Sequence, residues 1–391
     1  MIRGEFLAGA AAALGGGTLR QAQGRLQVAQ ILPGYTPTFR FSVVCPQSGP
    51  DGRLGKQLID GVRGAVDEIN RDRPSYQSLV LYNAYDDHND AAQATVQADF
   101  ATSAPDAMAV IGHLSAATTL VTQQLYSNAQ IAVIVPTVTD DRITERGYRN
   151  VFRLPAKDAD EGSLVAAYVI STGSKAPHVV SQDGLYGPNV AAGFLRRAGA
   201  LHIGAVGTQF SLDNPSYDNA AAAVLSHDPD CVVLAGNVDD MGPIMTVLRT
   251  KGFAGRFVGT QGFFDAITLK EFAKEAEGMV VASPVPYYPM APSTRQYVTD
   301  YETQYGAITP VAAFGYAAVQ LIRNAATRMN VVNRLAMIRA LANGGSYDTI
   351  TGNYQFGPNG DVLDPNCYFY RIADGKFSYE RQGHATGFML K

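Results

Sequence analysis

The stretch Ala107-Met108-Ala109-Val110-Ile111-Gly112-His113-Leu114-Ser115-Ala116-Ala117-Thr118-Thr119 predicts a strand, a loop and a helix start in direct succession. An apolar run of strand length opens it, and helical spacing then relates Leu114, Thr118, Val121 and Leu125. The first backbone N–H groups of a helix lack partners inside the helix, and the helix dipole favours an anion there. The loop lacks the glycines of phosphate-binding turns, so it suits a ligand with a single carboxylate better than a nucleotide. An ordinary strand-to-helix turn of an α/β fold fits the same residues.

Composition excludes several classes of protein. The chain has 391 residues, 46% of them apolar, which allows a sizeable core and suggests two domains. Its 31 basic and 35 acidic residues nearly balance, so no basic surface for nucleic acid is predicted. No apolar run reaches the roughly 18 residues that a membrane-spanning helix requires. Cys45, Cys231 and Cys367 have no metal-binding spacing, and the first two lie in apolar runs that predict burial.

Residues 1–37 are predicted to form a leader and a linker outside the fold. Arg3 supplies one early positive charge before a short apolar segment of small residues, which is typical of an export signal. The run Arg3-Gly4-Glu5-Phe6-Leu7 is similar to a twin-arginine motif whose second arginine has become glycine, so the export route stays open. We expect an exported, periplasmic or extracytoplasmic protein, with a disordered cytoplasmic tail as the alternative.

From Phe39 onward, strands and helices are predicted to alternate. The expected strands are Phe39–Cys45, Leu79–Tyr85, the run from Ala107, Ile131–Val135 and Asn150–Leu154. After the first strand, a helix presents an apolar face made of Leu54, Leu58, Ile59, Val62, Val66 and Ile69. Asp90 is expected to cap the next helix, whose apolar side carries Ala92, Val96 and Phe100. Such β–α units predict a parallel sheet with helices on both faces.

A second β–α series is predicted to start at Asp158-Ala159-Asp160-Glu161-Gly162, an acidic helix start. Its expected strands are Val179–Ser181, His202–Ala205, Cys231–Ala235, Phe257–Gly259 and Met279–Ala282, with helices starting near Pro188, Tyr217, Pro243 and Ala266. Pro243 suits a first helical turn, where its missing N–H costs nothing. Three helices then run from about Ser293 to Ala342, and strands at Asn353–Phe356 and Tyr368–Ile372 end the chain.

The order of elements predicts an α/β fold of two doubly wound parallel-sheet lobes joined by three crossovers. We expect residues 38–155 and 285–347 in the first lobe, and residues 156–284 and 348–391 in the second. The expected hinges are the crossings near Leu154–Lys157, Ala282–Pro286 and Ser346–Gly352. Ligands of open parallel sheets bind at the carboxyl ends of the strands, which predicts a ligand cleft between the lobes.

Two groups of residues are candidate sites of chemistry. Asp86, Asp87, His88 and Asp90 could form a metal cluster, although adjacent carboxylates before a helix more often anchor its start. His113 fits a catalytic base, a ligand contact or a hydrogen-bonded structural histidine. No Gly-x-Ser-x-Gly turn is present, so no hydrolase nucleophile is visible. We therefore predict no catalytic residue, no metal and no cofactor.

A series of short motifs runs in order along the chain: Ser48-Gly49-Pro50 with Gly55 and Gly61, Asp86-Asp87 with Asp90, Gly112-His113-Leu114-Ser115, Pro136-Thr137-Val138-Thr139, Glu145-Arg146-Gly147-Tyr148, Phe152-Arg153, Asp158 to Gly162, and Tyr186-Gly187. Each motif alone is weak. Together, from about Phe39 to the C-terminus, they resemble the branched-chain amino-acid-binding family of periplasmic proteins, which has the type I solute-binding fold.

The resemblance implies a two-lobed receptor that closes on a small ligand and delivers it to an ABC permease in the inner membrane. It implies that the ligand's carboxylate is held by backbone N–H groups and hydroxyls at Ser115, Ala116, Ala117, Thr118, Thr137 and Thr139. A second-lobe tyrosine that covers the ligand matches Tyr186. The family's acidic residue that holds an ammonium group matches Gln261, in Gly259-Thr260-Gln261-Gly262.

Departures from the family pattern bear on the ligand. Alanine replaces a ligand-facing serine at Ala116 or Ala117, and Gln261 removes a negative charge. Losing a charge-assisted hydrogen bond of about 1.5–3 kcal/mol should weaken binding of a zwitterionic amino acid tenfold or more. The candidate ligands are amino-acid-like molecules, organic or aromatic acids, and amides. Of these we therefore expect a neutral ligand or one whose only charged group is a carboxylate. His88 and Ser115 occupy the positions of a disulfide found in several relatives, so no bridge forms there.

Three functions stay open. The first is the extracytoplasmic substrate-binding receptor of an ABC importer, with a small-molecule ligand and a permease as partners. The second is a ligand-sensing regulator with the same fold, which would need no export. The third is an enzyme on a doubly wound fold, for which the sequence offers no nucleophile, cofactor loop or metal set.

Overall fold

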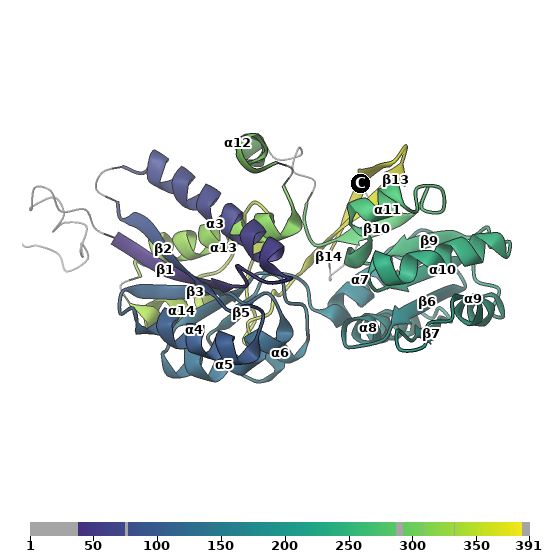
Figure 1. The fold of residues 1–391 in the computed structure, drawn as a ribbon, viewed down its shortest axis with the longest axis horizontal. Helices are drawn as coiled ribbons and strands as arrows, with labels where there is room; N and C mark the ends of the chain where they lie inside the picture. The colour runs from purple at the N-terminus through teal and green to yellow at the C-terminus, as the bar shows by residue number, and fades with distance from the viewer. Residues whose placement is uncertain (1–37, 75–76, 287–291, 307, 332, 385–391) are drawn as a thin grey trace, which may run out of the picture.

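A computed structural model describes residues 38–74, 77–286, 292–306, 308–331 and 333–384 of the chain. The predicted leader, residues 1–37, lies outside the described residues. Figure 1 shows two lobes side by side, each built around its own sheet. None of the described helices is both long and apolar enough to span a bilayer.

The first lobe contains a parallel five-stranded sheet in the order β2-β1-β3-β4-β5. Its strands are β1 (Thr38–Cys45), β2 (Leu79–Asp86), β3 (Ala107–Gly112), β4 (Ala132–Val135) and β5 (Val151–Arg153). One face is covered by α3 (Gly52–Asp72), α13 (Pro310–Met329) and α14 (Arg334–Asn343), the other by α4 (Ala91–Ser103) and α5 (Ala116–Asn128). The short α6 (Arg142–Glu145), α12 (Pro292–Tyr305) and the hairpin of β11 (Tyr347–Thr349) and β12 (Gly352–Tyr354) complete this lobe.

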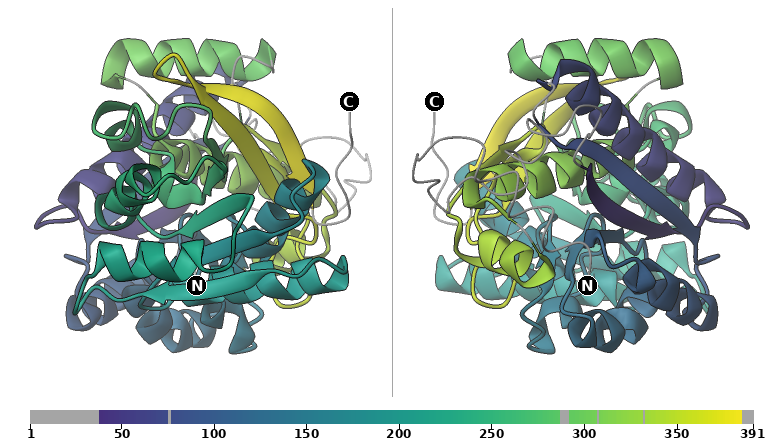
Figure 2. Two further views of the ribbon diagram at one scale, coloured as in Figure 1. Left: turned by 90° about the vertical axis from the view of Figure 1, so that its right-hand side faces the viewer. Right: turned by 90° about the vertical axis from the view of Figure 1, so that its left-hand side faces the viewer.

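The second lobe contains a seven-stranded sheet in the order β14-β13-β10-β9-β8-β6-β7. Five strands are parallel: β6 (Pro177–Gln182), β7 (Val206–Phe210), β8 (Cys231–Ala235), β9 (Arg256–Gly259) and β10 (Val280–Ser283). The antiparallel pair β13 (Asn366–Ala373) and β14 (Lys376–His384) extends one edge, shown in yellow in Figure 2. One face carries α7 (Asp158–Ser171) and α8 (Tyr186–Ala200); the other carries α9 (Tyr217–Leu225), α10 (Val238–Thr250), the 3-10 turn η1 (Gln261–Phe263) and α11 (Ala266–Lys270).

The predicted fold class is confirmed: two α/β lobes have helices on both faces of a sheet, and the chain passes between them three times. The first passage follows β5, and the second follows β10. The third differs from our prediction at Ser346–Gly352. Tyr354, Phe356 and Val362 are still buried in the core of the first lobe, and the second sheet resumes only at Asn366. We therefore propose 38–155 with 285–362 as the first lobe and 156–284 with 363–384 as the second.

Some local predictions were wrong. The strand expected at His202–Ala205 is Val206–Phe210, and α10 begins at Val238, so that Pro243 lies beyond its first turn. Helix α4 faces the core with the side opposite to the one that we expected. Its buried residues are the small Ala94, Ala98 and Ala101, whereas Val96 and Phe100 are 47% and 53% exposed. Alanine side chains let this helix lie close to α5 and the sheet. Choosing the buried face by the largest apolar side chains therefore selects the wrong face.

Candidate ligand-binding site

The first half of the candidate site lies where β3 ends and α5 begins. Gly112 permits a close approach there, because a Cβ on it would lie 2.1 Å from the carbonyl oxygen of Val44. Ser115 caps α5, and its Oγ accepts a hydrogen bond from the backbone N–H of Thr118 at 3.3 Å. The buried Thr118 hydroxyl contacts Ser115 Oγ at 2.8 Å, so it is already engaged within the loop. The N–H groups of Ala116 and Ala117 open the helix and have no acceptor among the described residues, which leaves them able to bind an anion.

The loop after β4 adds Thr137 and Thr139 to the same edge of the sheet. The Oγ1 atom of Thr137 is buried and has no hydrogen-bond partner among the described residues. The loop is held by Arg153, which is fully buried and donates to the carbonyl oxygens of Thr139 at 2.9 Å and Asp140 at 2.6 Å. The Thr139 carbonyl also accepts a bond from the N–H of Asp158, at 3.0 Å, so this loop contacts the first residue of α7 in the second lobe.

The second half of the candidate site is organised by Glu161 on α7. Its Oε2 accepts hydrogen bonds from the Tyr186 hydroxyl at 2.9 Å and from Gln261 Nε2 at 3.1 Å. Its Oε1 accepts a bond from the Gln261 backbone N–H at 2.9 Å. Glu161 is 6% exposed, and no ion pair joins it to a described lysine or arginine. One buried carboxylate therefore joins the two residues that were predicted to contact the ligand in this lobe.

Two glycines allow this arrangement by bringing α7 and α8 close together. A Cβ on Gly162 would lie 1.9 Å from the carbonyl oxygen of Val190, and one on Gly193 would lie 2.0 Å from that of Ala159. Any side chain at either position would force the helices apart. Their contact places Glu161 within hydrogen-bond distance of Tyr186.

Burial dominates the electrostatics of the two acidic residues on α7. Desolvation raises the pKa of Glu161 to about 7, against the opposing effect of the hydrogen bonds from Gln261 and Tyr186. Desolvation likewise raises the pKa of Asp158 to about 6, although hydrogen bonds from Thr139 and Asn189 favour its charged form. Both carboxyl groups therefore titrate close to neutral pH.

The predicted site residues thus fall into two groups, one in each lobe. Ser115, Ala116, Ala117 and Thr118 share the sheet edge with Thr137 and Thr139, while Tyr186 and Gln261 meet at Glu161. No described contact joins Ser115–Thr118 to Tyr186 or Gln261. From the sequence, Glu161 is only part of an acidic helix start. Its contact with Gln261, 100 residues further along the chain, has no signal in the local pattern.

The cavity beside Glu161 is small. It lies where the first two passages meet the start of β13, and its volume of about 10 Å³ is that of one water molecule. Its lining residues are Pro155, Ala156, Glu161, Gln261, Ser283, Pro284, Asn366 and Cys367.

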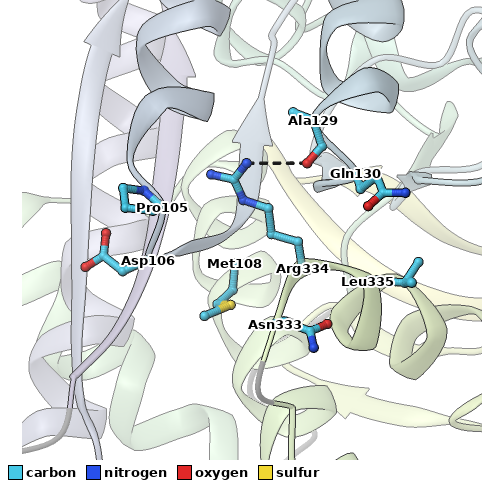
Figure 3. A pocket seen from close by; sticks show the side chains of 8 residues that line it. All are labelled: Pro105, Asp106, Met108, Ala129, Gln130, Asn333, Arg334 and Leu335. Carbon is cyan, nitrogen blue, oxygen red and sulfur yellow. Dashed lines mark hydrogen bonds between the residues drawn. The ribbon is translucent and has the colours of Figure 1, made fainter. Parts of the chain in front are cut away.

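A larger hollow, of about 710 Å³, lies at the opposite end of β3 and is open to solvent. Arg334 lies in it (Figure 3), but its guanidinium group donates to the carbonyl oxygens of Thr102, Ala104, Ala107 and Ala129. These carbonyls lie at the end of α4, the start of β3 and the end of α5, where a cation also meets the negative ends of two helix dipoles. Arg334 therefore joins three elements, and we interpret the hollow as structural.

The acidic loop after β2 is also structural. Asp90 caps α4 by accepting bonds from the N–H groups of Ala92 and Gln93. Asp87 and the Tyr126 hydroxyl bond the two ring nitrogens of His113, at 2.5 and 3.0 Å, and all three side chains are buried. His113 is thus a structural histidine. Among the described residues, no group of three or more His, Cys, Asp or Glu side chains could hold a metal ion.

Ser48, His88 and Asp86 lie together but not as a catalytic triad. Ser48 Oγ donates to Asp86 Oδ2 at 2.7 Å and lies 2.7 Å from His88 Nδ1. A hydroxyl has one hydrogen, so Nδ1 must donate to Ser48. The imidazole therefore does not accept the serine proton, as activation of a nucleophile requires.

Two α/β lobes joined by three chain passages are the architecture of a two-lobed binding protein. The family model described as periplasmic binding protein matches residues 38–376, and the chain belongs to this family. The Leu/Ile/Val/Thr-binding protein of Salmonella typhimurium is 25% identical over 358 residues, which cover 90% of this chain and 94% of the relative. The predicted membership of the branched-chain amino-acid-binding family is thereby confirmed.

Solved structures have the same fold. An ABC transporter substrate-binding protein from Desulfitobacterium hafniense, in complex with leucine, aligns with a TM-score of 0.74 at 21% identity, covering 88% of this chain and 100% of that one. A solute-binding protein from R. palustris, in complex with benzoate, aligns with a TM-score of 0.71 at 18% identity, covering 90% and 98%.

Proposed function

We propose that this chain is the extracytoplasmic receptor of an ABC importer, which captures a small carboxylic acid between its lobes and delivers it to a membrane permease. Family membership and the names of the similar proteins support a binding role in transport. The observation that carries the proposal is the division of the candidate site between two lobes that are joined by three chain passages.

In this proposal the first lobe binds the carboxylate of the ligand. The N–H groups of Ala116 and Ala117 and the unpartnered Thr137 hydroxyl are donors at one sheet edge, next to the positive end of the α5 dipole. Ser115 shapes this loop by capping α5, and Thr139 links it to Asp158. Residues after the first passage contribute Tyr186 and Gln261 on the other side. Rotation of the lobes about the passages would bring the two halves together.

A carboxylate is the group shared by the leucine and the benzoate bound in the two solved relatives. Export follows from the proposed role, and the signal-like residues 1–37 support it. Fractionation of cells that express the full chain should recover it outside the cytoplasm. Recovery in the cytoplasm would favour the ligand-sensing regulator instead.

Thermal unfolding of the full chain, in the presence of a panel of amino acids, hydroxy acids, aliphatic and aromatic acids and amides, tests the binding function. A ligand that binds only the folded state increases the free energy of unfolding by mass action, by about 2.7 kcal/mol at a hundredfold excess over Kd. The melting temperature therefore rises. We expect at least one acid to do so and its amide to be weaker. A panel in which no acid raises the melting temperature would contradict the proposal.

A further inference from the structure

We propose that Asp361, which lies outside the candidate ligand site, is a positioning residue for it. Through Arg153, its side chain holds the Thr137–Thr139 loop in the arrangement that binds the carboxylate of the ligand. The inference rests on the proposed function, because that function makes this loop part of the site. It gives a role to a residue that the resemblance left without one, 208 residues from Arg153 in the chain.

The loop after β4 is held through its backbone carbonyl oxygens. Nη1 of Arg153 donates to the carbonyl oxygen of Thr139 at 2.9 Å and to that of Asp140 at 2.6 Å. The Thr137 hydroxyl, in contrast, has no hydrogen-bond partner among the described residues. The position of this hydroxyl therefore depends on how the backbone that follows it is held, and Arg153 provides that hold.

Asp361 sets the orientation of the Arg153 guanidinium group. Its Oδ1 accepts hydrogen bonds from Nε at 2.9 Å and from Nη2 at 2.5 Å. Nη2 also donates to the hydroxyl of Thr144 at 2.6 Å, and that hydroxyl donates to the Asp361 carboxylate at 2.9 Å. All five N–H groups of the guanidinium are then used, two of them on the loop. Because this group is a rigid planar fork, a shift of Asp361 should also shift the two N–H groups that hold the loop.

Burial keeps the pair between Arg153 and Asp361 formed. Arg153 is 0% exposed, and among the described residues its only ion pair is with Asp361. A buried cation that loses its counter-ion is strongly destabilising, because no water replaces the lost partner. The pair is therefore a fixed link, unlike a surface ion pair that forms and breaks at little cost.

The turn that carries Asp361 is fixed to β5. The carbonyl oxygen of Gly360 accepts a hydrogen bond from the N–H of Arg153 at 3.0 Å. A Cβ on Gly360 would lie 1.8 Å from the carbonyl oxygen of Val151, so the turn lies directly against the strand. Asn359 Nδ2 donates to Asp361 Oδ2 at 2.8 Å. None of these contacts involves the loop after β4, so Asp361 provides a fixed point for the Arg153 side chain.

A double-mutant cycle, measured by isothermal titration of the full chain, tests the inference. The probe is whichever of leucine, phenylalanine, 4-methylpentanoate and benzoate binds the wild-type protein most tightly. Asp361→Ala should weaken its binding about tenfold, but less than about threefold in Thr137→Val, where the hydroxyl to be positioned is gone. The uncompensated charge on Arg153 is the same in both backgrounds and cancels in this comparison. Equal losses in the two backgrounds, or no loss in either, would overturn the inference and leave the proposed function intact. Binding of no probe by the wild-type protein, together with no shift in the thermal panel, would contradict the proposed function itself.

Two further variants separate positioning from charge and from the general loss of an ion pair. Asp361→Asn lacks the charge but keeps an oxygen for Nε and Nη2 of Arg153, so it should recover most of the affinity that Asp361→Ala loses. Asp106→Ala removes another Asp–Arg pair of the same lobe, with Arg40 at 3.0 Å, at the opposite end of β3 from the candidate site. This control should bind the probe as the wild-type protein does. If Asp361→Asn binds as weakly as Asp361→Ala, the role of Asp361 is its charge, and the inference is refuted.

Hydrogen–deuterium exchange on the wild-type protein decides the matter where Asp361→Ala does not fold. Coupling between two sites is reciprocal, so a ligand that fixes the loop after β4 must also tighten the turn that holds Asp361. Saturation with the same probe should slow amide exchange in residues 357–362. Exchange in the turn at residues 129–131, at the opposite end of β3, should not change. Unchanged exchange in residues 357–362 would show that the turn and the loop are not linked, and the positioning role would be wrong.

Discussion

The hydroxyl of Thr137 should lower stability in the free protein, and the proposed carboxylate ligand would give it a partner. The buried Oγ1 has no partner among the described residues, and such a group costs about 1–3 kcal/mol. We expect Thr137→Val, which keeps the shape, to leave the free energy of unfolding unchanged or raise it by up to about 1 kcal/mol, and to weaken ligand binding about tenfold. Thr118→Val is the matched control, because the Thr118 hydroxyl already bonds Ser115; its removal should lower the free energy of unfolding by about 1 kcal/mol. Denaturant unfolding and calorimetry measure the two effects, and a large loss of stability in Thr137→Val would contradict this interpretation.

The acidic residues on α7 make stability depend on pH. Burial raises the pKa of Glu161 from its ordinary 4.5 to about 7, so between these values the folded protein holds a proton that the unfolded chain has released. Stability from this group is therefore highest below about pH 4.5 and falls as the pH rises to about 7, by on the order of 3 kcal/mol as an upper bound. The stability of Glu161→Gln relative to wild type should increase across this range in urea unfolding. A constant difference would show that Glu161 ionises normally in the folded state.

At the residue scale, most residues of the candidate site could be proposed from the sequence, but the buried carboxylate beside them could not. The turn at Ser115, the Thr137–Thr139 loop and Tyr186 could be placed as candidate site residues from local patterns and family motifs. The loss of an acidic side chain at Gln261 suggested an uncharged site. The carboxylate of Glu161 reaches Gln261 only through the packing of α7 against η1, and no local pattern relates residues so far apart in the chain.

At the scale of elements, the contact between α7 and α8 sets the position of Glu161 relative to Tyr186. Gly162→Ala should gain up to about 1 kcal/mol of helix propensity, but its Cβ would lie 1.9 Å from the Val190 carbonyl, and such overpacking costs about 1–3 kcal/mol. We expect a net loss of stability and weaker ligand binding. Gly199→Ala, at the end of α8 with open space around its Cβ, should be neutral or slightly stabilising. Thermal unfolding compares the two variants, and equal behaviour would show that the helices separate without cost.

The buried faces of helices and strands were predictable where the larger apolar side chains are also the buried ones, and not elsewhere. Helix α3 buries Leu58, Val62 and Val66 as its periodicity predicts. In α4 the same periodicity fits two faces, and the alanine face is buried because the helix lies too close to its neighbours for larger side chains. The third passage was misplaced for a similar reason. The β11–β12 hairpin has only two short strands, and its place in the first lobe depends on the burial of Tyr347 and Tyr354, which strand patterns do not indicate.

At the scale of the molecule, Arg153 connects the Thr137–Thr139 loop to two of the three passages. It lies at the end of β5, just before the first passage, and pairs with Asp361, just before the third, at 2.5 Å. The same guanidinium group holds the carbonyl oxygens of Thr139 and Asp140. If rotation of the lobes about the passages moves Arg153, it should therefore also move the loop that we propose for carboxylate binding.

Small-angle scattering tests whether binding closes the two lobes. A single compact body of 391 residues would have a radius of gyration of roughly 21 Å, and two lobes held apart must exceed this value. We expect the acid that raises the melting temperature most to reduce the radius of gyration toward that limit, because closure would let one ligand contact the donors near α5 and the second-lobe residues Tyr186 and Gln261 together. Glu161→Gln under the same conditions should need more ligand to reach the same radius, because Glu161 holds both Tyr186 and Gln261 in position. An unchanged radius at saturating ligand would mean that the two halves do not close on one molecule, and hinge capture would have to be abandoned.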